Sequence, residues 1–380
     1  LAPGFAQKRE MLCGRFKERR PHPNPAITPG HALIIGAGLA GTATAERLAA
    51  RGWRCTILEA HTLACGASGN KAGVIRPQPS ADDNLLARLT RAGFLSTLSR
   101  LERLKLSGNP VDWDACGVLH LAKDADQEAL MQRTVAQLDA PRELLDGVSQ
   151  AQASELADLP LAAGGWWFSQ GGWVNPSDYC QQLLKASAAT LIENTSVASI
   201  TQDAHGWLAH DDKGALLARG DIVVLANATA IPTLAAPFTD ALPIRPARGQ
   251  TTVYATPPGP APKTVVCRSG YWTPSIRGES TSGASFLIDD TDLAERCSEH
   301  EDNLTMLAGI SPEAATALLM TDHSQLHGKV GLRPVVPDRL PLVGQVPNRP
   351  SAERRSLSRA ARARVPGLYV NSGYGARGIL

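Results

Sequence analysis

This sequence of 380 residues has few long uncharged runs and no closely paired cysteines, and neither sign of charge is in clear excess. The least charged stretch, residues 222–238, contains Asn227, Pro232 and Pro237, so it is a poor membrane span. Lysine and arginine total 38 against 36 for aspartate and glutamate, so composition alone does not indicate a nucleic-acid partner. The seven cysteines are scattered without a CxxC pair, which favours buried thiols in a reducing cytosol. Metal-ligand spacing and carboxylate partners in sequence are both absent for His31, His205, His210, His323 and His327. We therefore expect a cytoplasmic protein that binds neither membrane nor metal.

The composition is that of an ordinary globular protein. Hydrophobic residues make up 43% and charged residues 19% of the chain, and its length favours about two domains or subdomains. The first ordered unit opens with a short apolar run from His31 to Gly36, suited to a buried parallel strand. An alanine-rich helix to about Arg51 and a strand from Arg54 to Leu58 complete a βαβ unit. This order predicts the α/β class.

Three glycines follow the first strand in Gly36-Ala-Gly38-Leu-Ala-Gly41. The first permits a tight turn, the second lets the backbone approach a pyrophosphate, and the third allows close helix packing. The helix start adds unpaired N–H groups and a positive potential. Glu59, at the end of the next strand, can accept hydrogen bonds from a ribose diol. A lone glycine motif could be an ordinary turn, but strand, helix and acid in this order predict a dinucleotide site.

A second glycine-rich loop, Cys65-Gly-Ala-Ser-Gly-Asn70-Lys-Ala-Gly73, follows shortly after Glu59. A plain NAD dehydrogenase has no need of such a loop. In a flavoprotein it can bring backbone N–H groups and Ser68 against the pyrophosphate and the flavin edge. The alternative is a flexible surface loop. The loop therefore favours FAD over NAD or NADP.

Further helix signals lie downstream. Leucines from Leu85 to Leu101 predict an amphipathic helix from Ser80 to Leu106, with Ser80 as its N-cap. Asn175 and Pro176 supply an N-cap and a first-turn proline for a helix through Ala188.

Strand signals are concentrated in the middle of the chain. Residues 171–174 read as a strand, and short strands at 196–201, 206–210 and 222–226 predict a β-meander. Residues 245–290, rich in threonine, serine and valine, indicate a second, mainly antiparallel sheet. Residues 349–366 are arginine-rich with little apolar content, which favours an exposed loop.

Together these motifs resemble the D-amino-acid oxidase and glycine oxidase superfamily. Within it, the chain is most similar to the FAD-dependent half of the bifunctional tRNA 5-methylaminomethyl-2-thiouridine biosynthesis proteins. The resemblance rests on the two glycine loops with Glu59, on Tyr271-Trp-Thr-Pro274, and on the segments 172–176, 223–227, 331–334, 338–344 and 373–378. One departure is Ala228, which stands where such oxidases frequently have glycine.

The resemblance implies a Rossmann-like FAD-binding domain and a second, mainly antiparallel β-sheet substrate domain. We expect the first to comprise residues 31–79, 161–244 and 328–380, and the second residues 80–160 and 245–327. The FAD-binding residues implied are Gly36, Ala37, Gly38, Leu39, Ala40, Gly41, Glu59, Gly66, Ala67, Ser68, Gly69, Asn70, Gly73, Val197, Ala226, Asn227, Gly375, Arg377, Gly378 and Ile379. Arg377 and Gly378 would lie where a helix begins, so that its N-terminus stabilises negative charge on a reduced flavin.

The resemblance also implies oxidation of a carbon–nitrogen bond. The substrate would be 5-carboxymethylaminomethyl uridine at the tRNA wobble position, with glyoxylate and the aminomethyl base as products. Arg333 is the candidate for binding the carboxylate, because a guanidinium is a planar two-donor fork; an ion pair with Asp338 is the alternative. Tyr271 would close the substrate pocket, unless it is simply a core residue, and Arg248 is a weaker pocket candidate.

Two other functions stay open at this point: a small-molecule glycine or secondary-amine oxidase, and a flavin-binding fragment without turnover. A tRNA substrate requires phosphate contacts, which the basic stretches Lys8–Arg20 and Arg354–Arg364 could supply, although most charge runs are solvated loops. Residues 1–30 are interpreted as a linker in which Gly4–Met11 resembles the end of a methyltransferase domain. We therefore expect the chain to be a piece of a longer protein containing that domain.

Overall fold

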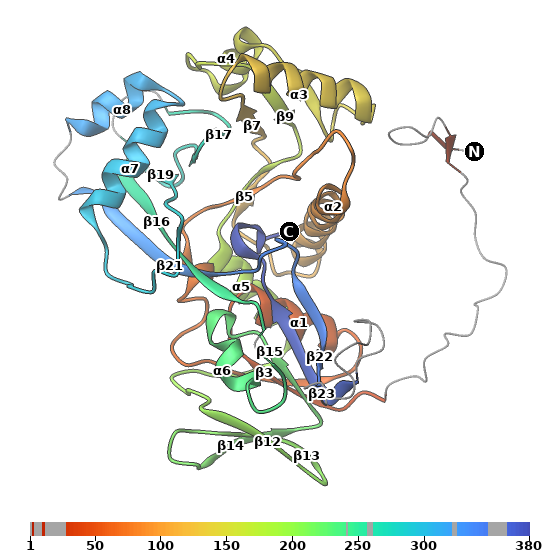
Figure 1. The fold of residues 1–380 in the computed structure, drawn as a ribbon. Helices are drawn as coiled ribbons and strands as arrows, with labels where there is room; N and C mark the ends of the chain where they lie inside the picture. Colours follow the sequence, from red (N-terminus) through yellow and green to blue (C-terminus); the bar gives the residue numbers. More distant parts are fainter. Residues whose placement is uncertain are drawn as a thin grey trace.

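The computed structural model describes residues 2–3, 10–11, 28–240, 242–256, 261–320, 325–348 and 363–380. In this part of the chain a parallel sheet lies at one end of the molecule and a larger antiparallel sheet at the other (Figure 1). A short pair, β1 (Ala2–Pro3) and β2 (Glu10–Met11), precedes them. The predicted α/β class with a second, mainly antiparallel sheet is confirmed. Most of the Lys8–Arg20 stretch and most of 349–366 fall outside the described residues, but Arg364 begins a strand rather than continuing a loop.

The parallel sheet has the strand order β11-β4-β3-β15-β23-β22. Its strands are β3 (His31–Ile35), β4 (Arg54–Leu58), β11 (Thr190–Ile192), β15 (Ile222–Leu225), β22 (Leu342–Pro347) and β23 (Arg364–Ser372), with only β22 antiparallel to its neighbour. The helices α1 (Leu39–Ala49) and α5 (Pro176–Ser187) pack beside one another against this sheet. The sequence predicted β4 to the residue, β3 to within one, and the Asn175 cap of α5, whose side chain accepts from Ser177 N and Asp178 N.

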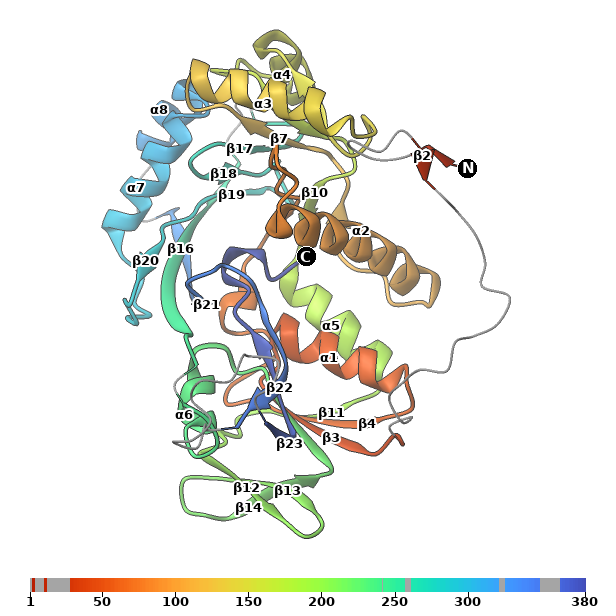
Figure 2. The same ribbon diagram turned by 45° about the vertical axis from the view of Figure 1, so that its right-hand side comes forward.

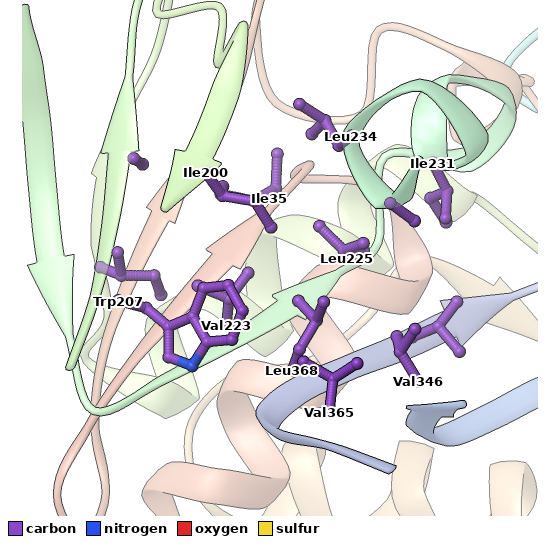
Figure 3. Close-up of a cluster of buried hydrophobic side chains, with 14 of the residues drawn as sticks. Ile35, Ile200, Trp207, Val223, Leu225, Ile231, Leu234, Val346, Val365 and Leu368 are labelled. Atoms are coloured by element: carbon purple, nitrogen blue, oxygen red, sulfur yellow. The ribbon is translucent and has the colours of Figure 1, made fainter. Parts of the chain in front are cut away.

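The two faces of the parallel sheet bury alternate residues. Leu33 and Ile35 pack with Trp207 on the face covered by a three-stranded sheet of β12 (Ser199–Asp203), β13 (Gly206–His210) and β14 (Leu216–Gly220). Figure 3 shows Ile35 and Trp207 in this cluster. Ala32 and Ile34 pack on the other face, toward α1. Because strands alternate sides, both sets are apolar and the sheet is buried on both faces.

This arrangement corrects the predicted meander. The third strand of the observed meander is β14, which the sequence pattern did not single out. Residues 222–225 do not belong to the meander and instead lie in the parallel sheet, between β3 and β23. The physical reason is burial: Val223, Val224 and Leu225 are all buried, as a central parallel strand requires, whereas β14 is partly exposed.

The larger sheet has the order β20-β16-β19-β18-β17-β7-β9-β8, with β21 paired to β16. Its strands are β7 (Val118–Leu121), β8 (Asp146–Val148), β9 (Gly165–Phe168), β16 (Arg245–Ala255), β17 (Val265–Cys267), β18 (Tyr271–Trp272), β19 (Glu279–Gly283), β20 (Leu287–Ile288) and β21 (His327–Val335). Only the β17–β7 pair is parallel. The helices α3 (Ala125–Leu138), α4 (Gln150–Ala157), α7 (Cys297–Ala308) and α8 (Pro312–Leu319) lie around this sheet (Figure 2).

Between the two sheets lie the helix α2 (Leu85–Leu106) and a small sheet of β5 (Gly73–Ile75), β10 (Gly172–Val174) and β6 (Trp113–Asp114). The N-cap of α2 is Asn84, which accepts from Ala87 N at 3.0 Å, so the prediction of Ser80 was wrong by one turn. Ser80 Oγ instead accepts from the backbone N of Asn84, within the turn before the helix.

Other sequence predictions have mixed outcomes. Cys55, Cys180 and Cys267 are buried, but Cys297 is exposed at the start of α7, against the expectation that the cysteines are buried. The domain ranges stay a prediction; β9 and β21 fall in ranges assigned to the FAD-binding domain but pair within the larger sheet.

Candidate functional site

A cavity of about 970 Å³ lies between the two sheets. From the side of the parallel sheet it is lined by the β3–α1 turn, Glu59 and Val197. From the side of the larger sheet, the substrate end, it is lined by Tyr271, Phe286 and residues 329–334 of β21. The end of the chain, residues 374–380, lines it as well. A single cavity therefore joins the dinucleotide motif to the substrate residues expected from the sequence.

The β3–α1 turn can form only with glycine at two positions. Gly36 has φ +103°, and a Cβ there would lie 2.7 Å from the carbonyl oxygen of Ala226. A Cβ on Gly41 would lie 1.9 Å from Gly36 O, so this glycine permits the close approach of the helix. The helix α1 has no side-chain cap, and Leu39 N donates to Ser68 Oγ at 3.1 Å. The remaining first-turn N–H groups have no partner within the helix and face an anion site.

Glu59 is fixed beside this turn. Its Oε2 accepts from Ala37 N at 2.7 Å and its Oε1 from His61 N at 3.0 Å. These bonds hold the carboxylate at the cavity wall, where its remaining acceptor capacity can meet a diol.

The second glycine loop packs against strand β21. Its centre is a 3-10 turn, Ala67–Gly69. A Cβ on Gly331 would lie 2.8 Å from Ala67 Cα, so the loop and the strand are in close contact. Lys329 Nζ, also on β21, donates to Cys65 O at 2.8 Å. Sequence reasoning missed Lys329, because its partner loop lies more than two hundred residues away.

Most of the expected FAD-binding residues line the cavity. These are Gly36, Gly38, Leu39, Ala40, Glu59, Gly66, Ala67, Ser68, Asn70, Gly73, Val197, Ala226, Asn227, Gly375, Arg377, Gly378 and Ile379. Ala37, Gly41 and Gly69 lie behind the wall: the first holds Glu59, and the other two permit close backbone packing. Asn227 Oδ1 is buried without a hydrogen-bond partner, and Ala228 takes φ +54° at the cavity wall. The unpaired acceptor of Asn227, the fixed carboxylate of Glu59 and the uncapped start of α1 are together suited to bind a dinucleotide.

The chain end differs from the predicted helix start. Residues 375–377 form a single 3-10 turn, and Arg377 Nη2 donates to Arg339 O at 3.1 Å. A Cβ on Gly73 would lie 2.1 Å from Ile379 Cδ1, so the chain end packs directly on the second glycine loop. Burial lowers the pKa of Arg377, and the charges of Arg339 and Arg76 add to this.

Arg333 and Tyr271 meet at the substrate end. The Arg333 guanidinium donates to Ser285 O at 3.1 Å and lies 5.6 Å from the centre of the Phe286 ring. It has no carboxylate partner among the described ion pairs, and Asp338 accepts from Leu340 N instead, against the alternative of an Arg333–Asp338 pair. Tyr271 donates to Ala72 O at 3.3 Å. Burial raises the pKa of Tyr271 to about 12, which the charge of Arg333 opposes.

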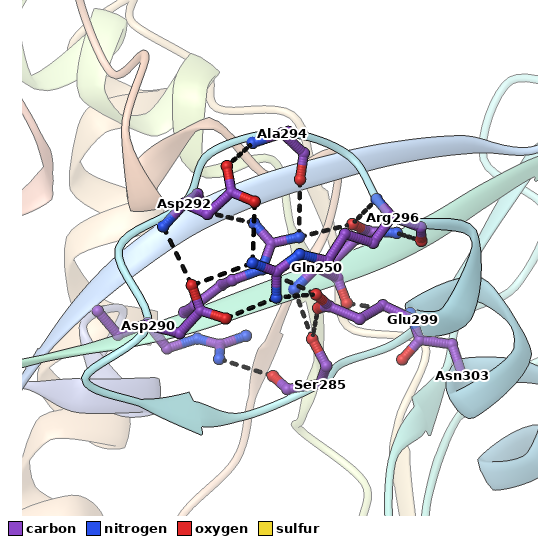
Figure 4. Close-up of polar contacts among 10 residues, drawn as sticks. Gln250, Ser285, Asp290, Asp292, Ala294, Arg296, Glu299 and Asn303 are labelled. Carbon is purple, nitrogen blue, oxygen red and sulfur yellow. Dashed lines mark hydrogen bonds and ion pairs between the residues drawn. The ribbon is translucent and has the colours of Figure 1, made fainter.

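Arg248 does not reach the cavity, which corrects the prediction of a pocket role. Its side chain is fully buried and pairs with Glu299, Nε to Oε1 at 2.7 Å. Figure 4 shows Glu299 with its neighbour Ser285. Glu299 also accepts from Ser285 Oγ, and Ser285 O in turn accepts from Arg333. Arg248 is therefore a positioning residue that holds the 285–299 segment behind Arg333.

The cavity wall is strongly cationic. Arg76, Arg268, Lys329, Arg333 and Arg377 all line it, and Glu59 is the one carboxylate among the described lining residues. Sequence reasoning missed Arg76, although its place three residues after Gly73 was a usable signal. In the described part of the chain, no group of three or more potential ligands is placed to hold a metal ion. Nor does any helix there have the length and apolarity to cross a membrane.

Comparison with known proteins gives three kinds of match. A family profile described as FAD dependent oxidoreductase matches residues 31–380. The chain is 46% identical over 387 residues to the tRNA 5-methylaminomethyl-2-thiouridine biosynthesis bifunctional protein of Azoarcus sp. (strain BH72), covering 100% of this chain and 59% of that protein. It is 40% identical over 401 residues to the protein of the same name from Pseudomonas aeruginosa (strain UCBPP-PA14), covering 100% and 60%. The chain thus spans about three fifths of the length of these relatives.

The fold is similar to solved oxidases. Glycine oxidase from Geobacillus kaustophilus aligns with a TM-score of 0.72 and 24% identity, over 92% of this chain and 90% of that one. Iminodiacetate oxidase from Chelativorans sp. BNC1 aligns with a TM-score of 0.74 and 22% identity, over 92% and 91%. At these identities the likeness concerns the fold.

Proposed function

The chain belongs to the family of FAD-dependent oxidoreductases, and from this membership we propose that it removes the carboxymethyl group from 5-carboxymethylaminomethyl uridine, with or without 2-thiolation, at the wobble position of tRNA. The products are the aminomethyl base and glyoxylate. The observation that carries the proposal is the one cavity that joins the FAD motif to Arg333, a cation without a carboxylate partner among the described ion pairs. The relatives named for tRNA 5-methylaminomethyl-2-thiouridine biosynthesis support the choice of substrate.

The reaction balances with one water. FAD, when bound, would supply the oxidant, a two-electron acceptor for the hydrogen of the carbon–hydrogen bond next to the carboxylate. The amine nitrogen loses its proton, and water adds to the resulting carbon–nitrogen double bond. Cleavage of that adduct releases glyoxylate and leaves a primary amine on the base.

The residues of the chain act by positioning and electrostatics. Arg333 binds the carboxylate with two parallel donors, and Ser285 O holds the guanidinium in place. Tyr271 stays neutral because burial raises its pKa to about 12, so it closes the pocket with its hydroxyl donated to Ala72 O and does not act as a base. Glu59, Asn227 and the start of α1 hold the dinucleotide.

The proposal extends to partners. tRNA is the partner that brings the substrate, and we therefore assign the reaction to the cytoplasm. The Lys8–Arg20 and Arg354–Arg364 stretches remain the predicted sources of phosphate contacts. In the relatives, which are named bifunctional, we assign the remaining two fifths of the length to a methyltransferase that would act on the aminomethyl product.

Product analysis tests this function. Undermodified tRNA carrying carboxymethylaminomethyl uridine is incubated with the FAD-loaded protein. The nucleosides of the tRNA are then identified by mass spectrometry. We expect aminomethyl uridine and an equal amount of glyoxylate. Unchanged tRNA together with rapid oxidation of glycine would establish a small-molecule oxidase instead.

A further inference from the structure

Arg76 is a cation on the cavity wall that the proposed function has not yet used. It follows strand β5, is half-buried and lines the cavity. Its guanidinium donates to Pro77 O at 3.2 Å and lies 6.0 Å from the centre of the Phe168 ring. None of the ion pairs between described residues includes Arg76. Since a guanidinium has five N–H donors, most of them remain for a ligand.

Arg268 lines the same cavity wall and has a structural role, which makes it a useful comparison with Arg76. It donates to three carbonyl oxygens, those of Ala122, Lys123 and Gly309, which fix it to the backbone. Arg76 has one such bond, to Pro77 O, and its side chain also hydrogen-bonds to the Cys267 thiol. The two arginines therefore differ in how much of the guanidinium is committed to the protein.

Arg76 also lies close to the substrate end. Cys267 is opposite Tyr271 in the β17–β18 register. Burial raises the pKa of the Cys267 thiol, and the positive charge of Arg76 lowers it, so Arg76 lies near Cys267. On the other side, the charge of Arg333 reaches Tyr271. Two guanidinium groups thus lie beside the same short hairpin.

One substrate carboxylate cannot balance the charges of both guanidinium groups, those of Arg76 and Arg333. Partly burying a cation is unfavourable unless an anion or several acceptors replace its water. Glu59, the one carboxylate of the described wall, is held by Ala37 N and His61 N in the β3–α1 region. In the proposed function the pyrophosphate of FAD lies at the start of α1, and the leaving carboxymethyl group provides one further negative charge, which Arg333 binds.

We propose that Arg76 binds a phosphate group of the substrate nucleotide and is a second anion-binding residue beside Arg333. This inference rests on the proposed function, because a nucleotide carries phosphate and a free amino acid does not. It makes Arg76 a specificity-determining residue: it distinguishes a nucleotide that bears the carboxymethylamino group from a simple amine that bears the same group.

The test compares two small substrates, the nucleoside 5-carboxymethylaminomethyl uridine and its 3′,5′-bisphosphate. With the FAD-loaded protein, we expect kcat/KM for the bisphosphate to exceed that for the nucleoside by roughly tenfold or more, as for one charge-assisted hydrogen bond. In Arg76→Gln this ratio should fall toward one, and Arg76→Lys should keep part of it as a point charge. Arg277→Gln is the matched control, because Arg277 is exposed, pairs with Asp112 and lies outside the cavity. A ratio in Arg76→Gln equal to that of the unaltered protein would overturn the assignment.

A binding experiment separates this inference from the proposed function. Titration of the FAD-loaded protein with inorganic phosphate, followed by the flavin absorption spectrum, should give a saturable response that Arg76→Gln loses and Arg333→Ala keeps. Titration with acetate should give a saturable response that Arg333→Ala loses and Arg76→Gln keeps. If the protein oxidises neither nucleoside nor bisphosphate, the proposed function fails, but the phosphate titration still decides the role of Arg76. No phosphate response, or one undiminished in Arg76→Gln, contradicts that role.

Discussion

Arg333 and Arg248 are close neighbours with different partners. Both lie on paired strands of the larger sheet, where Ala247 is opposite Arg333 and Arg248 is opposite Leu332. The sequence marks both as arginines near glycines and does not tell them apart, because the deciding contacts come from the 285–299 segment. That segment buries Arg248 against Glu299 and presents one carbonyl to Arg333. Tertiary contact, and not local pattern, separates the substrate residue from the positioning residue.

Replacement of Arg333 tests its role in binding. Arg333→Ala removes a charge-assisted bond worth about 1.5 to 3 kcal/mol, so kcat/KM for the carboxymethyl substrate should fall roughly tenfold or more. FAD content, measured from the visible to ultraviolet absorbance ratio, should stay unchanged, since Arg333 is not among the residues expected to bind FAD. Kinetics equal to those of the unaltered protein would exclude Arg333 from carboxylate recognition.

His120 predicts a dependence of stability on pH. Burial lowers the pKa of His120 to about 3, with Arg76 and Lys123 adding to the effect, and its Nδ1 has no partner. A folded pKa below the ordinary value of 6.5 means that the stabilisation is present above about pH 6.5 and is lost as pH falls toward 3. Over that window the loss is up to about 1.4 kcal/mol per pH unit.

Urea unfolding at about pH 7 and about pH 5 measures this loss. In His120→Gln the loss between the two conditions should be smaller by up to about 2 kcal/mol, because about 1.5 pH units of the window lie between them. His205→Gln, at an exposed turn, is the matched control and should leave the loss as it is. Equal losses in all three proteins would mean that His120 does not titrate in this window.

At the scale of elements, the βαβ unit could be predicted because its signals are local. The glycine turn, helix start and Glu59 occupy 24 consecutive residues, and their interactions stay within that span or reach neighbouring strands. The strand β15 was misassigned because a buried central strand and a meander strand look alike over four residues. Only its parallel pairing with β3 and β23, which are far away in sequence, settles its place.

Gly41 gives a test of the turn. Gly41→Ala places a Cβ 1.9 Å from Gly36 O, so the helix must move away from the turn. Overpacking of this kind costs about 1 to 3 kcal/mol. We expect a lower melting temperature and reduced FAD content. In Gly309→Ala, the control, the nearest contact of the added Cβ is 3.3 Å, and both measurements should change much less. Full FAD content in Gly41→Ala would contradict the assignment of this turn.

The Arg248–Glu299 pair predicts a double-mutant result. Removing one member leaves an uncompensated buried charge, so Arg248→Met or Glu299→Leu alone should destabilise the fold by about 3 to 5 kcal/mol. The double variant should be more stable than the less stable single variant, because no isolated charge remains. Melting temperatures and urea midpoints measure these values. Additive losses would show that the two side chains act independently.

At the scale of the whole molecule, the function depends on bringing two sheets to one cavity. The sequence predicted most of the wall nearest the dinucleotide, since those residues lie in glycine motifs. It missed Arg76 and Lys329, whose importance comes from a cavity formed by segments more than two hundred residues apart. The sequence could also place the second sheet, but not the segment that holds Arg333, because that depends on pairing between β16, β20 and β21.

Anaerobic reduction of the bound flavin by tRNA tests the central claim most directly. The FAD-loaded protein is mixed without oxygen with undermodified tRNA carrying carboxymethylaminomethyl uridine, and the visible absorption of oxidised flavin is followed. We predict that this absorption is lost, with one glyoxylate released for each flavin reduced, and that fully modified tRNA has no effect. Flavin that stays oxidised with this tRNA but is reduced by glycine or another small amine would contradict the account.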